Sequence, residues 1–447
     1  MMHRKTHYFL RLVISALFLF SCSSEQNDTP QITLNVPANA NLIQRLGMEL
    51  KAYEKENNVR VKLIPFSGQE KLYAMIAAGQ PPDIFYTNTV VRDQLAAEGL
   101  LQNLHDIAAN DPFVQRILPE FIERGESLDG GWYQFCDWTY TFGVYYNKDL
   151  FDQFNIPYPD STWDWQGMLD RAGKLTVRTQ DDAAYEQYGV YIARHFFSAI
   201  ELMAGARSQP NELLFDISEA SQTALRLYLD LMFKHDVMPQ LKYVQAQGMQ
   251  MAQMLNTGKV AMVVEAVPNL DFISSLKINW DVAPFPQIGN HARRYFRSAS
   301  GGLSISSNCQ HPELAWELLK WLVTKSPYNT PNPVLKDSEV ISGWKQKYPI
   351  LAKTHFDQVW RLSEQFDGGD SRDFVRYFSW SSNVILEQVS PKMDLVLANQ
   401  LSIADLLAMK AEINAKVLRE LQIVADNPSL KPAFRQAIQQ RLAEINK

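Results

Sequence analysis

An alternation of strand-like and helix-like segments near the N-terminal end restricts the fold more than any other feature of the chain. The strand-like segments repeat apolar residues at every second position, and the helical ones repeat them at every third or fourth position. The order is strand 32–36, helix 41–53, strand 59–63, helix 68–78 and strand 83–86. Strands that are joined through helices run parallel in one sheet. The sequence therefore predicts an open α/β sheet with parallel strands.

Two later segments carry clear helix starts. Pro312 opens a segment in which three leucines share one helical face. Ser402 and Asp405 stand three residues apart before an apolar stretch, which is the pattern of a capping box. We find no internal repeat and no low-complexity segment that would indicate a solenoid or a disordered region.

The chain is long enough for several domains, and its composition is ordinary. Of its 447 residues, 46% are hydrophobic and 21% are charged, as in typical globular proteins. At about 100–200 residues per domain, two to four domains are expected. The net charge of −6 becomes −9 without residues 1–21, which hold three basic residues and no acid. This acidic body argues against nucleic acid as a partner, because phosphates are bound by clustered Lys and Arg.

Residues 1–21 have the organisation of a secretory signal peptide. A basic stretch, 1–11, precedes a mainly apolar stretch of nine residues, 12–20. Nine helical residues rise only about 13 Å, against about 30 Å for a bilayer core. The segment ends Leu-Phe-Ser-Cys at Cys22, which resembles a bacterial lipobox. We therefore expect a lipidated Cys22 with a flexible tether over 22–31, which anchors the protein to a bacterial membrane outside the cytoplasm, in the periplasm or at the cell surface. An ordinary signal peptide with a coincidental cysteine is the alternative.

The other two cysteines are Cys136 and Cys309. An oxidising compartment permits a disulfide between them. Two separate buried thiols are the other interpretation, and the sequence leaves the choice open.

The sequence lacks the motifs of the common enzyme classes, namely G-x-S-x-G, H-E-x-x-H, C-x-x-C and G-x-G-x-x-G. Gly258-Lys259 is no phosphate loop, because Gln253 replaces the first Gly and Val260 replaces the Ser/Thr. The histidines show no ligand spacing, and we interpret the acidic cluster in 367–373 as a turn rather than a calcium loop. We therefore predict no catalytic residue, no cofactor and no metal. A pair of glycosidase carboxylates has no spacing rule, so an enzyme stays an open alternative.

Seven segments in order resemble those of the extracellular solute-binding proteins of ABC importers, in the sugar-binding family that includes maltose-binding protein. The most specific segment, 71–85, contains Gly-Gln-Pro-Pro-Asp between a helix and a strand. The others are 95–101, 145–151 with the helix start at 162–164, 256–262, 282–286, 301–302 and 311–316. The resemblance spans about residues 31–420, which is nearly the whole mature chain.

The resemblance implies a two-lobed α/β fold of the periplasmic-binding-protein type (type II), with a hinge that the chain crosses more than once. The expected units are 1–21 as signal peptide, 22–31 as tether, 32–140 and 296–332 as the first lobe, and 141–295 and 333–447 as the second lobe. The expected crossings lie at 140–146, 294–300 and 330–334. The ligand would lie between the lobes, which would close over it.

Candidate ligand-binding residues follow the carboxyl ends of the expected strands or lie where the family carries a cleft aromatic. A sugar site combines aromatic faces with side chains that donate and accept hydrogen bonds. The candidates are Asn39, Phe66, Ser67, Gln69, Thr87, Asn88, Asp137, Trp138, Phe196, Phe197, Glu265, Asn269, Gly301, Gly302 and Trp380.

Several candidates have a structural alternative. Trp138 could pack in the hinge, one of Phe196 and Phe197 could belong to the core, and the Gly301-Gly302 pair could serve the hinge turn. An acid at 265 directly after an apolar run is costly unless it is exposed or paired, which favours a place for Glu265 in the cleft.

The chain also departs from its relatives at two aromatic positions. Segment 265–269 reads Glu-Ala-Val-Pro-Asn where many relatives carry Gly-x-Trp, and 87–88 reads Thr-Asn where maltose-type members carry Trp. A maltodextrin is therefore only one of the possible ligands, next to another oligosaccharide, a monosaccharide or a polyol.

The resemblance implies a membrane-anchored receptor that acts as a monomer, captures a carbohydrate and delivers it to the permease subunits of an ABC importer. Two alternatives stay open. The same fold could present its ligand to a signalling receptor as a sensor subunit, or the protein could process glycosides at the surface.

Overall fold

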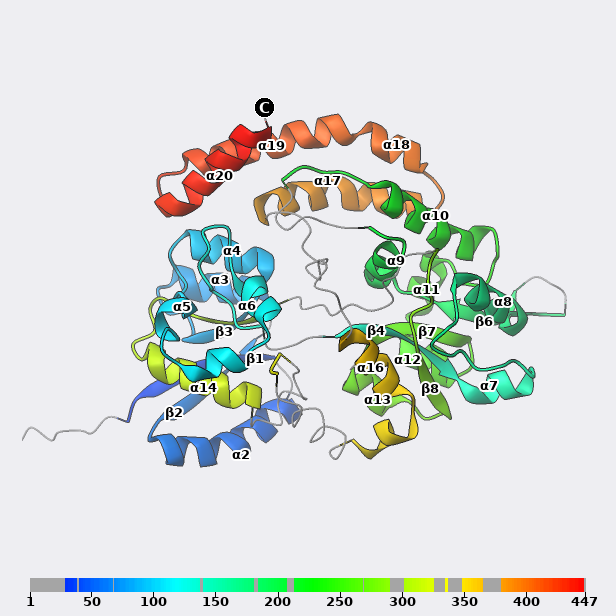
Figure 1. Ribbon diagram of the computed structural model, residues 1–447, viewed down its shortest axis with the longest axis horizontal. Helices are drawn as coiled ribbons and strands as arrows, with labels where there is room; N and C mark the ends of the chain where they lie inside the picture. The colour runs from blue at the N-terminus through cyan, green and yellow to red at the C-terminus, as the bar shows by residue number, and fades with distance from the viewer. Residues whose placement is uncertain are drawn as a thin grey trace, which may run out of the picture.

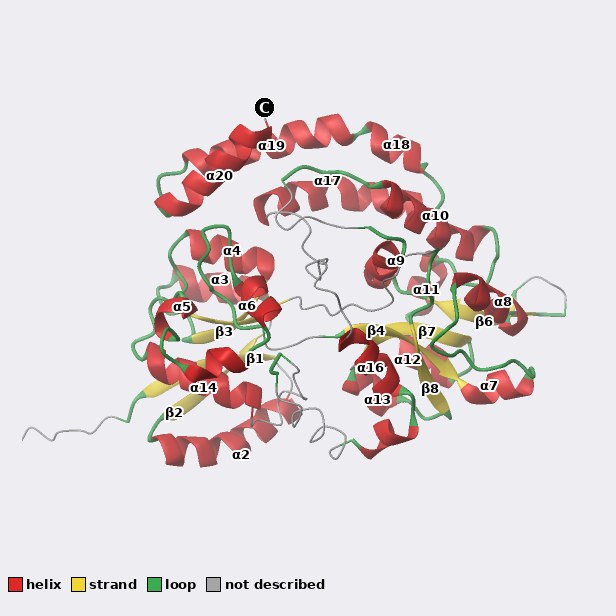
Figure 2. Cartoon of the chain, viewed as in Figure 1, coloured by secondary structure: helices red, strands yellow, loops and turns green. Residues whose placement is uncertain are grey.

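The computed structural model describes residues 29–37, 40–66, 68–136, 140–180, 184–206, 213–267, 269–289, 301–324, 334–336, 348–364 and 379–445. These residues form a mixed α/β fold with two separate sheets, one in each of two lobes (Figure 2). Helices surround both sheets. This architecture confirms the predicted two-lobed α/β fold class.

The sheet of the first lobe has the strand order β2–β1–β3–β9. Its strands are β1 (Gln31–Pro37), β2 (Arg60–Phe66), β3 (Ile84–Asn88) and β9 (Gly301–Ile305). The first three run parallel, as the β-α-β-α-β pattern predicts, and β9 joins β3 antiparallel. The helices of this lobe are α2 (Ala40–Asn57), α3 (Gln69–Ala77), α4 (Thr89–Ala97), α5 (Leu104–Ile107), η1 (Pro112–Arg116), α6 (Pro119–Gly125) and α14 (Pro312–Thr324).

The strand alternation decides which face of this sheet each helix covers. Leu34 and Val36 of β1 pack with Leu46 of α2 and Leu318 of α14 in the first-lobe core. Phe85 of β3 belongs instead to a different apolar cluster with residues of α3 and α4. Because side chains alternate along a strand, each face of the sheet has its own set of helices.

The sheet of the second lobe has the order β5–β6–β7–β4–β8. Its strands are β4 (Thr141–Asn147), β5 (Val177–Arg178), β6 (Tyr185–Tyr191), β7 (Val260–Val267) and β8 (Trp280–Pro284). Its helices are α7 (Lys148–Gln153), α8 (Trp165–Leu175), η2 (Arg194–Phe196), α9 (Phe197–Met203), α10 (Glu219–Phe233), α11 (Leu241–Gln247), α12 (Met251–Asn256), α13 (Leu270–Ser275), η3 (Pro349–Lys353) and α16 (Phe356–Glu364). Every residue of β4 and β7 is buried, since both strands lie inside the sheet. Most of the apolar stretch 140–146, predicted as the first hinge crossing, is thus a central strand of this lobe.

Up to residue 364, before the C-terminal helices, the chain passes between the lobes three times. Cys136 and Leu335 pack in the first-lobe core, whereas Tyr140, Ile288 and Leu351 pack in the second-lobe core. The passages therefore lie between 136 and 140, between 288 and 301, and between 335 and 351. The last one comes later in the chain than the expected boundary at 332/333, because residues 334–335 still contribute to the first lobe. The predicted crossing residues 294–300 and 330–333 lie outside the described residues.

The C-terminal helices are shared between the lobes instead of belonging to the second lobe alone. They are α17 (Ser379–Leu397), α18 (Ile403–Ala408), α19 (Lys410–Asp426) and α20 (Pro432–Ile445). Figure 1 shows them as an arch that runs from α10 on one lobe to α3 and α4 on the other. The predicted capping box of Ser402 and Asp405 is present at the start of α18.

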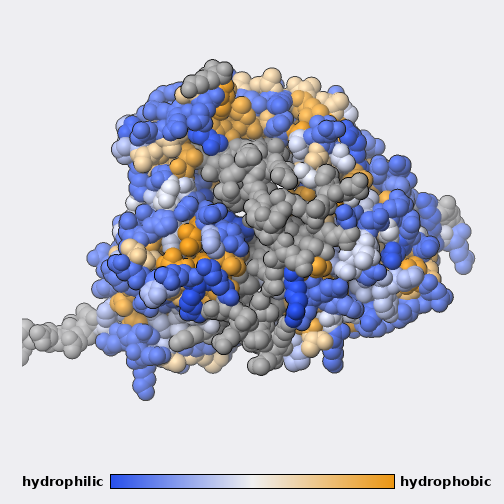
Figure 3. All heavy atoms as spheres, viewed as in Figure 1, coloured by the Kyte–Doolittle hydropathy of each residue, from blue (hydrophilic) through white to orange (hydrophobic). Residues whose placement is uncertain are grey.

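Cys136 and Cys309 are buried and form no disulfide, which agrees with the interpretation of two separate cysteines. The predicted signal peptide and Cys22 lie outside the described residues. Within the described part of the chain, no helix combines the length and the apolar character that crossing a membrane requires. The visible face of the described part is mostly hydrophilic in both lobes (Figure 3).

Candidate functional site

Some of the described candidate residues lie at strand ends next to the passages between the lobes. In the first lobe Thr87 pairs with Gly302, directly after the second passage. In the second lobe Thr141, directly after the first passage, pairs with Val267. Ligands of open α/β sheets lie beyond the carboxyl ends of strands, and β3 and β7 both end at these edges.

Thr87 takes part in a buried polar network of the first lobe. Its Oγ1 lies 2.8 Å from Oγ of Ser304, and Nε2 of Gln134 donates to both the carbonyl and the hydroxyl oxygen of Thr87 at 2.7 and 2.8 Å. The Asn88 side chain accepts from the backbone N–H of Val91 and caps α4. Both residues therefore hold the loop after β3 in place, and their contact with a ligand stays a prediction.

Gly301 and Gly302 are required for close packing of β9. A Cβ at Gly302 would overlap the carbonyl oxygen of Phe135, and one at Gly301 would overlap the Tyr86 hydroxyl. This close approach gives the pair a structural role at the sheet edge, beside any contact with a ligand.

Asn35 of β1 is a polar residue that sequence reasoning passed over. It is 4% exposed, and its Oδ1 has no hydrogen-bond partner within the described structure. It lies one residue beyond Leu34, which pairs with Ile84 of β3. Polar residues alternate with apolar ones along β1, and this pattern is typical of a strand whose polar face is exposed to solvent. The sequence therefore gives no sign that the face with Asn35 is buried.

Two of the predicted aromatic residues, from distant parts of the chain, pack against the same apolar cluster. Phe66, at the end of β2, and Trp380, in the first turn of α17, both pack at the margin of one apolar cluster. Both stay half-buried, as an aromatic face for a sugar needs. Gln69 is exposed at the start of α3. Tyr86 at the end of β3 is an aromatic residue that the prediction missed, and it is 39% exposed.

The predicted pair of Glu265 and Asn269 is brought together at the end of β7. Oε1 of Glu265 accepts from the backbone N–H of Ala266 at 2.7 Å, and the Asn269 side chain also hydrogen-bonds the carboxyl. Burial raises the pKa of Glu265, and these two hydrogen bonds oppose the shift. Oδ1 of Asn269 accepts from the N–H of Phe272 and caps α13.

Phe196 and Phe197 are engaged inside the second lobe. Phe196 is buried and meets Phe142 edge-on, with ring centroids 5.2 Å apart. Phe197 meets Tyr228 in the same manner at 5.7 Å. The prediction expected one core residue in this pair, and Phe196 is buried accordingly.

A cavity of about 540 Å³ opens where β6 ends, next to the predicted residues Phe196 and Phe197, neither of which lines it. Its volume is in the range of small-ligand sites. Arg194 of η2 forms an ion pair with Asp394 of α17 across it. Burial lowers the pKa of His195, so this imidazole is neutral at pH 7. The lining residues are Tyr191, Ala193, Arg194, His195, Phe233, Gln240, Leu241, Lys242, Gln245, Met249, Gln250, Met251, Asp394, Leu397 and Ala398.

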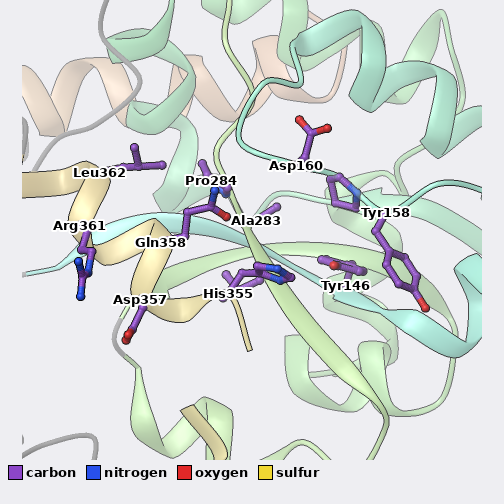
Figure 4. A pocket seen from close by; sticks show the side chains of 12 residues that line it. Tyr146, Tyr158, Asp160, Ala283, Pro284, His355, Asp357, Gln358, Arg361 and Leu362 are labelled. Atoms are coloured by element: carbon purple, nitrogen blue, oxygen red, sulfur yellow. The ribbon is translucent and has the colours of Figure 1, made fainter. Parts of the chain in front are cut away.

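A second cavity, of about 660 Å³, lies entirely on the second lobe between α16 and the loop around Asp160 (Figure 4). Tyr146 and His355 line it. The buried carboxylate of Asp281 holds the start of α16 at this cavity. It accepts hydrogen bonds from the backbone N–H and from Nδ1 of His355, the residue before α16, both at 2.7 Å. None of the predicted ligand-binding residues lines this cavity.

Some candidates lie outside the described residues. These are Asn39, Ser67, Asp137, Trp138 and the acidic cluster in 367–373. Among the residues that the structure does describe, no three His, Cys, Asp or Glu side chains are arranged to hold a metal ion.

Residues 39–327 match the family described as bacterial extracellular solute-binding protein. The chain belongs to this family. Its members are binding proteins and not enzymes, which agrees with the prediction of no catalytic residue.

Similar proteins agree with this assignment. A protein of Brucella abortus (strain 2308) that is named as a binding protein is 23% identical over 286 residues, which are 62% of this chain and 67% of that protein. The structure is similar to an ABC substrate-binding protein from Listeria monocytogenes in complex with cycloalternan, with a TM-score of 0.70 and 20% identity, over 87% of this chain and 99% of that one.

Two further solved structures share the fold. The maltose/maltodextrin-binding domain MalE from Bdellovibrio bacteriovorus, bound to maltotriose, gives a TM-score of 0.63 at 17% identity over 88% of this chain and 100% of that one. A solute-binding protein of an ABC transporter from Agrobacterium vitis with bound D-mannitol gives 0.61 at 17% identity over 88% and 99%.

Proposed function

We propose that this solute-binding protein is a lipid-anchored receptor that captures a carbohydrate between its two lobes and delivers it to an ABC-type permease. The observation that carries the proposal is the two-lobed fold itself, in which the chain passes three times between the lobes before the C-terminal helices. Such a hinge allows the lobes to close over a solute, and the solute favours the closed state through its contacts with both lobes.

A carbohydrate or polyol suits the chemistry of the candidate residues. Phe66 and Trp380 offer half-buried aromatic faces from the first lobe and α17. Glu265 and Asn269 offer carboxylate and amide groups from the second lobe. Aromatic faces with polar groups beside them bind the CH faces and hydroxyl groups of sugars. The similar structures named above hold cycloalternan, maltotriose and D-mannitol, which supports the same class here.

The solute need not be a maltodextrin. Thr87, with its hydroxyl bonded inside the lobe, stands where maltose-type members carry a tryptophan platform. We therefore place the aromatic contacts at Phe66 and Trp380, with Trp138 and Asp137 as further proposed contacts at the first passage.

A thermal-shift screen of residues 24–447 tests the proposal. The panel contains monosaccharides, oligosaccharides, polyols, amino acids and polyamines. A solute at a hundredfold excess over its Kd stabilises the folded state by about 2.7 kcal/mol, so a binder gives a clear rise in the midpoint. A rise with one sugar or polyol class, with no product after incubation, supports the receptor. A rise only with amino acids or polyamines, or turnover of the sugar, contradicts it.

The lipid anchor has a separate test. In bacterial cells, we expect the intact chain in the membrane fraction and in the detergent phase after Triton X-114 partition. Cys22→Ala should move the protein to the aqueous phase, because one side chain carries the acyl groups. Equal partition of both proteins would contradict lipidation at Cys22.

A further inference from the structure

We infer that residues 410–445, which form helices α19 and α20, act as a clasp between the lobes: a connection in addition to the three passages described above that restricts how far the lobes move apart. The restriction itself is independent of any solute. Its consequence, control over how readily the binding site opens, rests on the proposed function.

The clasp is fastened to the first lobe by an apolar surface. Phe434, Ile438 and Leu442 of α20 are buried in one cluster with Leu95 and Ala97 of α4. Phe434 and Ile438 have no exposed surface. Burying a large apolar side chain stabilises a contact by about 1.5–3 kcal/mol, so this row makes α20 an integral part of the first-lobe surface.

Polar contacts fix the position of this attachment. The backbone N–H of Lys431, one residue before α20, donates to the carbonyl oxygen of Ala97 at 2.8 Å. Nζ of Lys431 lies 4.8 Å from the ring centroid of Tyr133 and donates to its hydroxyl at 3.1 Å. The link between α19 and α20 is thus held at the C-terminal end of α4.

The other end of the clasp is fastened to the segment that leads into α10 of the second lobe, and the Phe215 side chain of this segment packs in the same cluster as α20. Asn414 of α19 makes two hydrogen bonds with the backbone of Phe215, one to its N–H at 2.7 Å and one to its carbonyl oxygen at 3.1 Å. Nζ of Lys410 pairs with Asp216 at 2.7 Å. Residues 215–216 lead directly into α10 of the second lobe, and Leu406 of α18, just before the clasp, packs in the second-lobe core.

These two attachments make the clasp a mechanical link. It begins on the second lobe and ends on the first, so any rotation about the hinge must shift one attachment. The second-lobe end is continuous with α18 and has directional hydrogen bonds and an ion pair. The first-lobe end relies mainly on apolar contact, which has no preferred direction. Separation or sliding of the lobes therefore acts on the α20–α4 contacts, beside those of α17 with α4, and these contacts restrict the range of interlobe distances.

Spin-label distances in the solute-free full-length chain test this inference. Spin labels at Lys51→Cys on α2 and Lys174→Cys on α8, both exposed, report the interlobe distance in the otherwise unchanged parent. The chain without these two added cysteines, treated with the same label, controls for labelling of the native cysteines. The test variant carries Phe434→Ala and Ile438→Ala. The matched control carries Leu255→Ala, a fully buried residue of α12 in the second-lobe core.

We expect a narrow distance distribution for the parent and the control, and a distribution at least twice as broad for the test variant. Hydrogen exchange of α20 checks that the double substitution has undocked the helix, and the truncation 1–431 removes the helix if it has not. An unchanged distribution with α20 undocked or absent would overturn the inference. Because no solute is present, a failure here is distinct from a failure of the proposed function.

Discussion

The buried carboxyl of Glu265 gives a prediction that separates stability from binding. Glu265 is 5% exposed, has two hydrogen bonds from Ala266 and Asn269, and no cation is bonded to it in the described part of the chain. Burial raises its pKa, and each unit of such a shift costs about 1.4 kcal/mol of stability when the group is ionised. Glu265→Gln keeps the size and the acceptor for the Ala266 N–H but removes the charge. We therefore expect the variant to be more stable than the parent at pH 7.

The pH dependence fixes the sign of this effect. A carboxyl whose pKa is higher in the folded state costs nothing below about pH 4.3, where it is protonated in both states. Its cost grows as the pH rises from there and levels off above the folded pKa. The gain from Glu265→Gln should therefore be present at pH 7 and absent at pH 4.

Calorimetric midpoints at the two pH values measure the gain. For a lobe of this size, 1 kcal/mol shifts the midpoint by about 2–4 °C. Asp281→Asn is the matched control, because Asp281 is equally buried but is bonded to His355 and to the N–H of Val282. Losing hydrogen bonds to a charged group costs about 1.5–3 kcal/mol, so this control should be less stable than the parent.

Solute affinity completes the test of Glu265. If the carboxylate accepts hydrogen bonds from the solute, Glu265→Gln should weaken binding by about tenfold while the midpoint rises. A variant that is less stable at pH 7, or one that gains as much at pH 4, would refute the electrostatic reasoning. A more stable variant with unchanged affinity would remove Glu265 from the binding site.

Three further predictions follow from the same structure. Asn35→Leu should raise the thermal midpoint, because an unpaired buried carbonyl oxygen costs about 1–3 kcal/mol and a leucine of similar size removes it; a lower midpoint would show that the amide is used. Gly302→Ala should lower the thermal midpoint by several degrees, because the added methyl would overlap the backbone of Phe135. Gly173→Ala in α8 is the control: its methyl meets open space, so the midpoint should stay unchanged or rise. Equal effects of the two substitutions would contradict the close packing of β9 at Gly302. Phe66→Ala and Trp380→Ala should each weaken binding of the solute found in the screen by about 1–3 kcal/mol in a titration, and unchanged affinity in a folded variant would exclude that ring from the site.

Local patterns in the sequence predict local structure well in this protein. The alternation in 32–86 gives three parallel strands with two helices, and Ser402 with Asp405 gives a helix start. Both features depend on residues that are neighbours in the sequence. The apolar stretch 140–146 is different, because an unbroken apolar run is equally consistent with a crossing and with a buried strand. Only its pairing with β7 and β8 decides that it lies inside a sheet.

The candidate site could be predicted in part for the same reason. Glu265 and Asn269 are four residues apart, so the sequence is enough to expect that they meet. The burial of Asn35 and the engagement of Thr87 with Ser304 depend on residues 50 to 217 positions away. No periodicity reports such contacts, and a polar side chain in an alternating strand looks the same whether or not a helix covers it.

The C-terminal helices show most clearly what a single sequence leaves undetermined. Ile413, Val417 and Leu421 recur at helical spacing, so the sequence predicts that one face of α19 is buried. It does not say against which lobe, because an apolar face fits either core equally well. Contacts with a preferred direction decide this, and here they point to both lobes. Asn414 binds the backbone of Phe215 in the segment that leads into α10 of the second lobe, while Lys431 binds Ala97 and Tyr133 of the first lobe. A helix pair with specific contacts to both lobes belongs to neither, and that dual attachment makes it a restraint on the hinge.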